Sequence, residues 1–375
     1  MLYSNANIFR PDGTFRRGSF TVENGRFGEI TDSLTERADV DLQGLCVIPG
    51  LIDIHTHGNS GFDFSEAEEG SMEAMTRYWA SCGVTSVTPA SMTVSLAMLE
   101  KAYRMADSFR GARPEYCARI QGVNMEGPFF SYNKRGAQNP AYLLKPDVNA
   151  VRRLNEASRG IIRLVDVAPE LEGAMDFIEE ISRECTVSIA HTEADYELAK
   201  EAIAHGATNL THLFNAMPGI HHRNPGPVVA GSESDTVYAE LICDGLHVAP
   251  AVVRMAFKLF PGRISIISDS LSCCGLPDGE YESGGLPVTL RDNLCRLHDG
   301  TIAGSVCNAY QGMLNCVKFG IPREEAILAA TIHPAHQARC DGEIGSIETG
   351  KLADFVVCRE DLSREAVYIG GKKIG

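Results

Sequence analysis

Two histidines one residue apart, His55 and His57, follow the apolar run of residues 47–54. A run of this kind is typical of a buried strand. Because residues two apart in an extended chain point to the same side, both imidazoles can reach one metal ion. A His-x-His pair also arises by chance, but this one lies where the strand meets the glycine-containing segment of residues 58–61. This position indicates that the pair stands at the end of a sheet, where a bound ligand can reach both side chains.

Further polar side chains stand at or just after the ends of other predicted strands: Glu126, His191, His212, His247 and Asp269. Any one of them could be a core residue with a satisfied hydrogen bond, but so many at strand ends indicate a site. Imidazole and carboxylate groups suit Zn²⁺ or Fe²⁺, and a carboxylate can bridge two ions. Glu126 could therefore join a metal held by the first histidine pair to one held by His191 and His212.

These residue types predict a metal-dependent hydrolysis. A metal ion lowers the pKa of bound water to about 7, so that hydroxide forms at neutral pH. Asp269 only accepts hydrogen bonds when it is ionised, so it can take a proton from that water and pass it to a leaving group. We therefore expect Asp269 to be the general acid/base.

The middle of the chain alternates predicted strands and helices. Strands are expected at residues 47–57, 84–89, 120–126, 162–168, 187–191, 208–213, 238–244 and 264–269. Helical stretches separate most of them, for example residues 71–81, 94–108, 194–205 and 251–260, and helices at 305–319 and 322–332 follow. This alternation predicts an α/β fold with a (β/α)8 TIM-like barrel over residues 49–344. In such a barrel the active site lies at the C-terminal ends of the strands.

Two long connections interrupt the alternation, and the two ends of the chain lie outside it. Residues 127–146 form a polar and aromatic loop, and residues 271–300 are expected to be a hairpin insertion. Loops of this length are often lids or binding loops, with a dispensable insertion as the alternative. Residues 1–48 and 345–375 carry short apolar runs and turn signals, among them Asn24-Gly25. We expect these ends to build one small β-sandwich domain together.

Composition limits the partners and the location. The 375 residues carry a net charge of −15, which argues against nucleic acid or an anionic membrane as the partner. No apolar run reaches the roughly 18 residues of a membrane-spanning helix, and the N-terminus does not resemble a signal peptide. The 12 cysteines include no CxxC pair. Together these features predict a cytoplasmic protein with reduced thiols.

Seven short segments carry a resemblance to a known family. They are HTHG at 55–58, NMEGPFF at 124–130, AHTEA at 190–194, THLFNAM at 211–217, DGLHV at 244–248, ISDS at 267–270 and GKLADFVV at 350–357. With these motifs the chain resembles the N-acetylglucosamine-6-phosphate deacetylases of the amidohydrolase superfamily over essentially its whole length. EGPF and HLFNAM are specific to the deacetylases, whereas HTHG and ADFVV mark the superfamily at large.

The resemblance implies roles for the metal-site residues. Glu126, His191 and His212 are expected to hold the catalytic metal. His55 and His57 suggest a second ion, so the cofactor is expected to be one or two divalent ions, Zn²⁺ or Fe²⁺, per subunit. Asp269 matches the general acid/base of the family. The histidine of DGLHV, His247, is expected to bind the substrate and polarise its acetyl carbonyl.

The resemblance also implies a set of substrate contacts: Ala137, Gln138, Asn215, Ala216, Arg223, His247, Ile302, Ala303 and Gly304. Arg223 suits the 6-phosphate of the sugar, because a guanidinium offers a fixed fork of donors to phosphate oxygens. Members of the family commonly have histidine where this chain has Gln138. This departure bears on the identity of the sugar more than on the reaction.

The implied function is removal of the acetyl group from N-acetylglucosamine 6-phosphate by a protein that forms a homodimer. Another N-acetyl amino sugar phosphate, such as the galactosamine or mannosamine derivative, stays open. Enzymes that open cyclic amides usually bridge their metals with a carboxylated lysine on the fourth strand, and residues 162–168 contain no lysine. A catalytically inactive scaffold would have lost metal ligands, which this chain retains.

Overall fold

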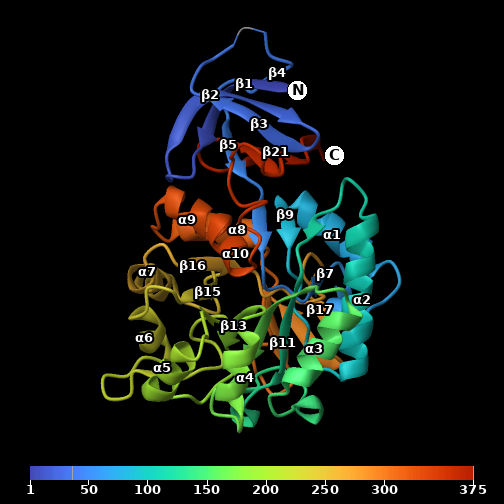
Figure 1. Cartoon of the computed structure of the whole chain (residues 1–375), viewed down its shortest axis with the longest axis vertical. Coiled ribbons are helices and arrows are strands. Elements are labelled where there is room, and N and C mark those ends of the chain that lie inside the picture. Colours follow the sequence, from blue (N-terminus) through green and yellow to red (C-terminus); the bar gives the residue numbers. More distant parts are fainter. Residues whose placement is uncertain (36, 375) are drawn as a thin grey trace.

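Strands from both ends of the chain meet in one sheet at one pole of the molecule (Figure 1). The computed structural model describes residues 1–35 and 37–374. The sheet has the order β22-β21-β20-β5-β1-β2-β3, with β4 paired to β1. Its strands are β1 (Leu2–Phe9), β2 (Phe15–Glu23), β3 (Arg26–Thr31), β4 (Val40–Asp41), β5 (Cys46–Pro49), β20 (Phe355–Cys358), β21 (Arg364–Ile369) and β22 (Lys372–Lys373). Asn24 and Gly25 join β2 to β3 with positive φ angles of 50° and 78°, as the predicted hairpin turn requires.

The chain then enters a series of parallel strands that pair in the order of the sequence. One sheet joins β6 (Leu51–Asp53), β9 (Val84–Val87) and β10 (Arg119–Ile120). A second sheet is six-stranded. It consists of β11 (Val123–Phe129), β12 (Ile162–Val167), β13 (Thr186–Ile189), β14 (Asn209–Leu210), β15 (Tyr238–Ile242) and β16 (Ile264–Ile267). Their burial on both faces explains the apolar composition of these strands.

Backbone contacts link the two parallel sheets at both of their edges. An isolated parallel bridge joins Ala90, beyond β9, to Asn124 in β11. On the other side the Asp269 amide donates to the His55 carbonyl at 2.8 Å, and the His57 amide donates to the Ser270 carbonyl at 2.8 Å. The strand pairing itself is not continuous around this series, so the structure shows the α/β architecture without a single closed sheet.

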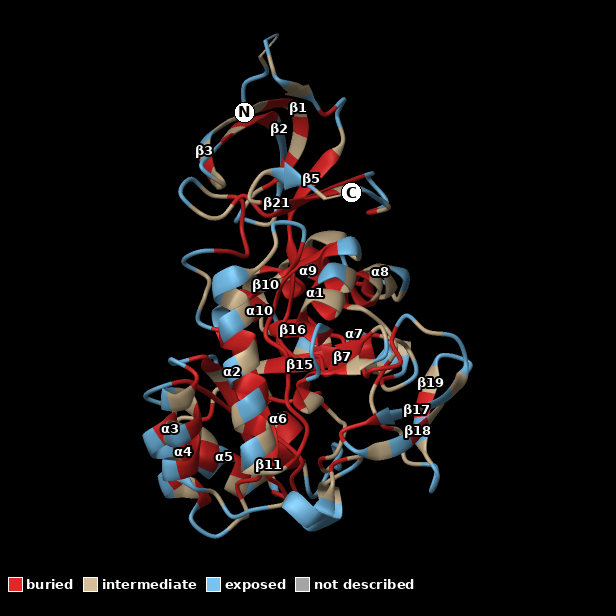
Figure 2. Ribbon diagram, turned by 90° about the vertical axis from the view of Figure 1, so that its right-hand side faces the viewer, coloured by how far each residue is buried: buried red, intermediate tan, exposed pale blue. Residues whose placement is uncertain are grey.

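Helices cover the outer side of the parallel strands, with their buried faces turned inward (Figure 2). Several begin with the expected side-chain caps, for example Ser95 before α2 and Asp195 before α5. The predicted helix at 322–332 is two helices, because the backbone leaves helical geometry at Thr331. The helices are α1 (Ser71–Ser81), α2 (Leu96–Ala112), α3 (Val148–Ala157), α4 (Ala174–Ile181), α5 (Tyr196–Ala204), α6 (Gly226–Ser232), α7 (Pro250–Leu259), α8 (Ala309–Lys318), α9 (Arg323–Ala329) and α10 (Ile332–Gln337).

The long connections have structure of their own. Residues 127–146 contain the short 3-10 helices η2 (Tyr132–Lys134) and η3 (Pro140–Tyr142). The insertion after β16 is a three-stranded antiparallel sheet rather than a simple hairpin, and it stands on one side of the molecule (Figure 2). Its strands are β17 (Gly279–Ser283), β18 (Leu286–Arg291) and β19 (Leu294–Leu297). A further pair, β7 (Gly58–Asn59) and β8 (Phe62–Asp63), and the 3-10 helix η1 (Phe64–Glu66) follow the first histidines.

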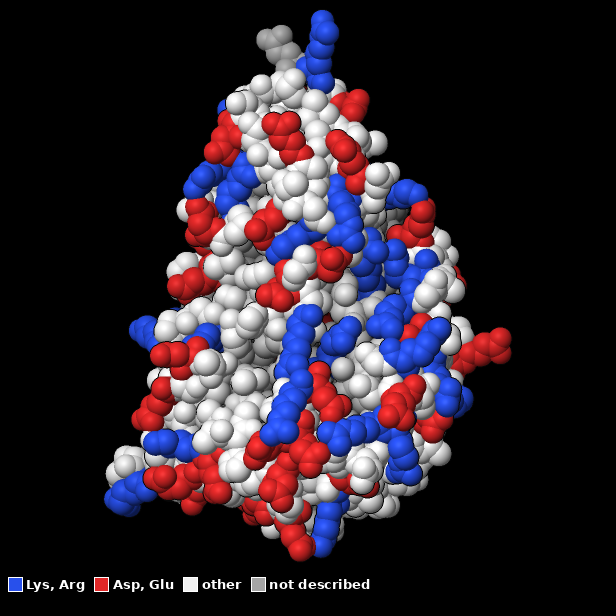
Figure 3. All heavy atoms as spheres, viewed as in Figure 1, with Lys and Arg blue, Asp and Glu red and all other residues white. Residues whose placement is uncertain are grey.

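An ion pair ties the terminal sheet to the parallel strands. Arg119 in β10 donates to both carboxylate oxygens of Asp354, which also accepts the Gly370 amide. The Asp354 side chain is 3% exposed, so it depends on these partners. Elsewhere charges of both signs are interspersed over the face seen in Figure 3. In the described part of the chain, no helix combines the length and apolar character that crossing a membrane requires.

Candidate active site

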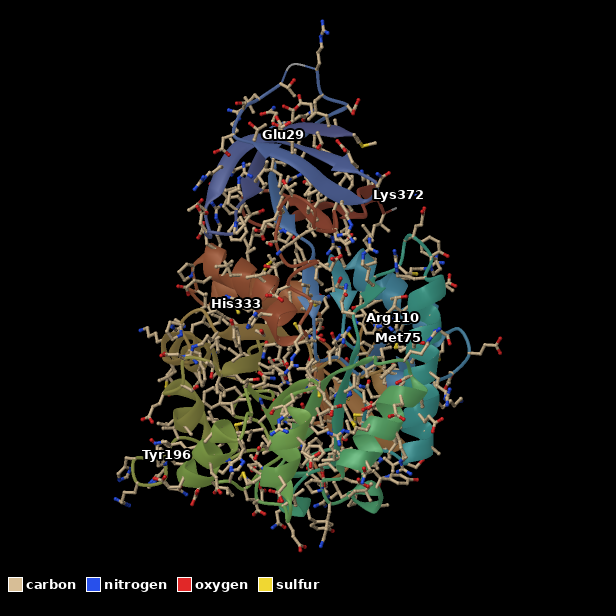
Figure 4. All side chains as sticks on the ribbon, viewed as in Figure 1. Glu29, Met75, Arg110, Tyr196, His333 and Lys372 are labelled. Carbon is tan, nitrogen blue, oxygen red and sulfur yellow. The ribbon has the colours of Figure 1, made fainter. Side chains whose placement is uncertain are left out.

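The polar residues predicted at strand ends do meet in the interior. His55 and His57 follow β6, His191 follows β13, and His212 comes two residues after β14. All four are buried, and their side chains surround Glu126 in β11, which is 1% exposed. His333, by contrast, lies on α10 near the terminal sheet (Figure 4) and contacts the Ile264 carbonyl at the opposite end of β16. The C-terminal ends of the parallel strands thus form the site.

One group of ligand atoms consists of Glu126, His191 and His212. Glu126 Oε1 lies 3.0 Å from His191 Nε2 and 3.3 Å from His212 Nε2, and the two nitrogens are 3.1 Å apart. Atoms bound about 2 Å from a tetrahedral ion lie roughly 3.3 Å from one another. The three atoms therefore have the spacing of three ligands around one divalent metal ion.

The second group shares the same carboxylate. His57 Nε2 lies 3.2 Å from Glu126 Oε2, and His55 Nε2 lies 3.4 Å from Glu126 Oε1. His55 Nε2 is buried and has no hydrogen-bond partner, which is costly unless the nitrogen binds something. Asp269 Oδ1 approaches this group at 3.1 Å from His57 Nε2. The donor set fits a second metal position bridged by Glu126.

Hydrogen bonds on the far side of the rings orient three of the histidines. His55 Nδ1 lies 2.9 Å from Glu240 Oε2, His57 Nδ1 lies 3.1 Å from the Ala90 carbonyl, and His191 Nδ1 lies 2.8 Å from the Lys134 carbonyl. These acceptors assign the ring proton to Nδ1 and leave the Nε2 lone pairs facing the centre. Sequence reasoning missed Glu240, although a glutamate within the buried strand β15 is itself a signal.

The charges of the cluster support one another. Burial alone raises the pKa of Glu126, but the neighbouring His55 and His57 hold that pKa well below its ordinary value. Burial lowers the pKa of His55, and the Glu126 and Glu240 carboxylates outweigh it, so that this pKa is well above its usual range. The cluster therefore favours an ionised Glu126 carboxylate, which a metal cation would also stabilise.

The backbone is unusual at three of the site residues. His191, His212 and Asp269 have positive φ angles of 45°, 29° and 49°. Residues with side chains rarely adopt this region, and such conformations cluster at functional sites. Here they turn the chain two residues beyond the ends of β13, β14 and β16, so that each side chain faces the common centre.

A cavity of about 300 Å³ opens onto the cluster. Most of the substrate contacts expected from the sequence line it: Ala137, Gln138, Asn215, Ala216, His247, Ile302, Ala303 and Gly304. Arg223 does not belong to this lining; it is exposed, and its Nη1 lies 2.7 Å from His222 Nε2. Among the described residues that line the cavity, Lys134 is the one lysine or arginine.

His247 presents one ring nitrogen to this cavity. Its Nδ1 lies 2.6 Å from Asp244 Oδ2, whereas its Nε2 is buried and has no partner. Burial lowers the pKa of His247, but Asp244 raises it more, so that the net shift is upward. A protonated His247 can donate from Nε2 to a carbonyl oxygen in the cavity.

Parallel strands whose C-terminal ends gather histidines around a glutamate beneath a cavity define a metal-dependent hydrolase. The protein-family model described as "Amidohydrolase family" matches residues 46–250 and 263–374. The chain belongs to the amidohydrolase family and, within it, to the group of the N-acetylglucosamine-6-phosphate deacetylases. The resemblance inferred from the sequence motifs is thereby confirmed.

Individual relatives can be aligned with this chain over nearly their full length. The N-acetylglucosamine-6-phosphate deacetylase of Vibrio furnissii is 32% identical and covers 94% of this chain and 89% of its own length. An N-acetylgalactosamine-6-phosphate deacetylase of Escherichia coli O157:H7 is also 32% identical, over 92% of this chain and 90% of its own. The solved structure of a Mycobacterium smegmatis deacetylase variant with N-acetyl-D-glucosamine 6-phosphate has a TM-score of 0.93 at 31% identity, over 100% of this chain and 99% of its own.

Proposed function

We propose that this protein hydrolyses the amide of N-acetylglucosamine 6-phosphate to give glucosamine 6-phosphate and acetate. The observation that carries the proposal is the pair of histidine groups that meet at Glu126 on the floor of the cavity. Relatives named for this reaction match the chain over nearly its whole length. The proposal includes closure of the parallel strands into a (β/α)8 barrel over residues 49–344, with residues 1–48 and 345–375 as one small β domain. The backbone contacts at both edges of the two parallel sheets support this closure.

The metal ligands in this proposal are His55, His57, Glu126, His191 and His212. Their nitrogen and carboxylate donors fit Zn²⁺ or Fe²⁺, with one or two ions in each subunit. When bound, a divalent ion polarises the acetyl carbonyl and lowers the pKa of water. Elemental analysis of the purified protein distinguishes the two metals and counts the ions.

Asp269 is the proton carrier in this mechanism. Asp269 is 8% exposed and lines the cavity beside His57, so that its carboxylate faces both the ligand cluster and the cavity. It accepts a proton from the attacking water and delivers that proton to the departing amine nitrogen. His247 donates a hydrogen bond from Nε2 to the acetyl oxygen, where negative charge develops.

The sugar binds between the loops that follow β11, β14 and β16. Ala137, Asn215 and Ala216 line one part of the cavity, and Ile302, Ala303 and Gly304 line another. In this proposal Arg223, which is exposed and stands outside the cavity lining of its own chain, binds the 6-phosphate in the active site of the partner subunit of a homodimer. Mixed dimers that combine an Arg223→Ala subunit with an Asp269→Asn subunit test this arrangement. If Arg223 serves the partner's active site, one site carries both substitutions and the other site carries neither, so activity remains. If Arg223 serves its own active site, each site carries one substitution and activity is lost.

N-acetylgalactosamine 6-phosphate is a second candidate substrate. The reason is the Escherichia coli O157:H7 relative named for that sugar, which is as similar to this chain as the Vibrio furnissii enzyme, at 32% identity. The two sugars differ at one hydroxyl group, and a site that hydrogen-bonds a hydroxyl can discriminate strongly against its epimer.

The decisive experiment measures acetate release by the metal-loaded protein. The substrates are both N-acetyl hexosamine 6-phosphates and unphosphorylated N-acetylglucosamine, with a chelator-treated sample in parallel. Release that requires both metal and phosphate, and is faster for the glucosamine derivative, supports the proposal. Faster release from the galactosamine derivative assigns the second candidate, and no release from either phosphate by protein that contains metal refutes the proposed reaction.

A further inference from the structure

The side chain of Gln138 is buried although it belongs to the loop between β11 and β12. It is 4% exposed and lies between two other segments of the site. Its Nε2 donates to Glu126 Oε2 at 2.6 Å, and its Oε1 accepts the backbone amide of Thr93 at 2.6 Å. Both ends of the amide are therefore engaged with the protein.

These two contacts fix the orientation of the amide. The Thr93 nitrogen is a backbone donor, so the group that faces it must be the carbonyl oxygen of Gln138. The NH₂ group then faces Glu126 Oε2, to which it donates. The approach of the Thr93 segment depends on Gly127, where a Cβ atom would come 2.1 Å from Thr93 Oγ1.

Glu126 needs such a contact because of the task that its two oxygens share. Oε1 faces His191, His212 and, at 3.4 Å, His55, while Oε2 faces His57. The terminal torsion of a glutamate is soft, so that the covalent structure alone does not fix the plane of the carboxylate. A donor placed on Oε2 removes that freedom and still leaves lone pairs for an ion, since an ionised carboxylate has about four acceptor positions.

We infer that Gln138 is a positioning residue, which turns the carboxylate of Glu126 so that Oε1 faces His191 and His212 while Oε2 faces His57. It acts on the metal site through Glu126, not on the sugar. The inference rests on the metal-binding role of Glu126 in the proposed function and is independent of which sugar is the substrate. A neutral amide suits this task, because it supplies a donor without adding charge to the cluster.

Gln138→Glu removes the donor at nearly constant size and adds one negative charge. The variant keeps the length of the side chain and an oxygen for the Thr93 amide, but it places a second carboxylate oxygen against Glu126 Oε2. Loss of a hydrogen bond to a metal-ligating group typically costs about 10- to 100-fold in metal affinity. We expect Zn²⁺ affinity, measured by competition with a chromogenic chelator, to fall by about this factor.

Gln138→Asn is the uncharged second variant. It is one methylene shorter, so its amide reaches only one of the two partners, and we expect a smaller loss of Zn²⁺ affinity in the same direction. Asn139→Asp is the matched control. It adds one negative charge at the neighbouring position and keeps the oxygen that caps η3, so Zn²⁺ affinity should stay as in the unmodified protein.

Kinetics separate positioning from substrate contact. If Gln138 positions Glu126, kcat falls, KM stays within about twofold, and excess Zn²⁺ restores kcat in Gln138→Asn. Unchanged Zn²⁺ affinity in both Gln138 variants overturns the inference, as does a raised KM at full metal occupancy. The metal titration needs no turnover, so it gives a result even if neither sugar phosphate proves to be a substrate.

Discussion

Replacement of Asp269 by asparagine tests the proposed chemistry most directly. Asparagine keeps the size of the side chain and an oxygen beside His57 Nε2, which lies 3.1 Å from Asp269 Oδ1. It cannot carry a proton between water and the leaving nitrogen. Because general acid–base catalysis contributes about 100- to 10,000-fold, we expect kcat to fall by that factor. The corresponding loss of transition-state stabilisation is roughly 3–5 kcal/mol.

The assay follows acetate release together with metal content. Asp269→Asn should retain the metal ions of the unmodified protein and a KM within about threefold, because the five proposed ligands remain. Asp235→Asn is a suitable control, since Asp235 is exposed and precedes β15 at the opposite end of the strands. A variant that keeps more than about a tenth of the normal kcat would refute the proton-carrier role. Loss of the metal would instead make Asp269 a ligand.

Three further predictions concern the metal, a pKa and the fold. Removal of metal by a chelator should abolish acetate release, and Zn²⁺ or Fe²⁺ should restore it; activity that survives in protein shown to be metal-free contradicts the mechanism. Asp244 raises the pKa of His247. If protonated His247 is the donor, activity declines as pH rises through that pKa, so Asp244→Asn should move this decline in the kcat/KM profile to lower pH; an unmoved profile shows that His247 acts without titrating. Arg119→Met leaves the buried Asp354 carboxylate without its cation, and the free energy of unfolding in urea should fall by roughly 2–3 kcal/mol, less than for a fully buried pair because Arg119 is 22% exposed. An unchanged urea midpoint would show that Asp354 is satisfied by the Gly370 amide alone.

Strand-end residues were predictable from the sequence because parallel strands deliver their C-terminal ends to one place. His55 and His57 followed from an apolar run and a spacing of two. Glu126 followed from its position at the end of the strand expected at 120–126, although the observed strand β11 runs from Val123 to Phe129. Hydrophobic periodicity predicts the lengths of strands less well. The strand expected at 208–213 is reduced to Asn209–Leu210, since the chain turns at His212 with a φ of 29°.

Contacts between segments that lie far apart in the chain could not be predicted from the sequence. Glu240 stands 185 residues from His55, and nothing in the local pattern of β15 connects it with that ring. The role of Gln138 depends likewise on the Thr93 amide, 45 residues away. In both cases a polar side chain is buried and its partner comes from another strand or loop. Only the folded arrangement identifies which group it orients.

Assembly of the site and closure of the parallel strands depend on the same contacts. The Asp269 amide binds the His55 carbonyl, and the His57 amide binds the Ser270 carbonyl, so the last strand reaches the first through the site residues themselves. Thr56 Oγ1 and Ser270 Oγ, 2.8 Å apart, reinforce this seam. Metal ions bridged by Glu126 would connect β6, β11, β13 and β14 as well, and a ligand that binds only the native state stabilises it. The strained backbone at the strand ends is therefore held from two sides, by the hydrogen-bonded seam and by the shared ligand cluster.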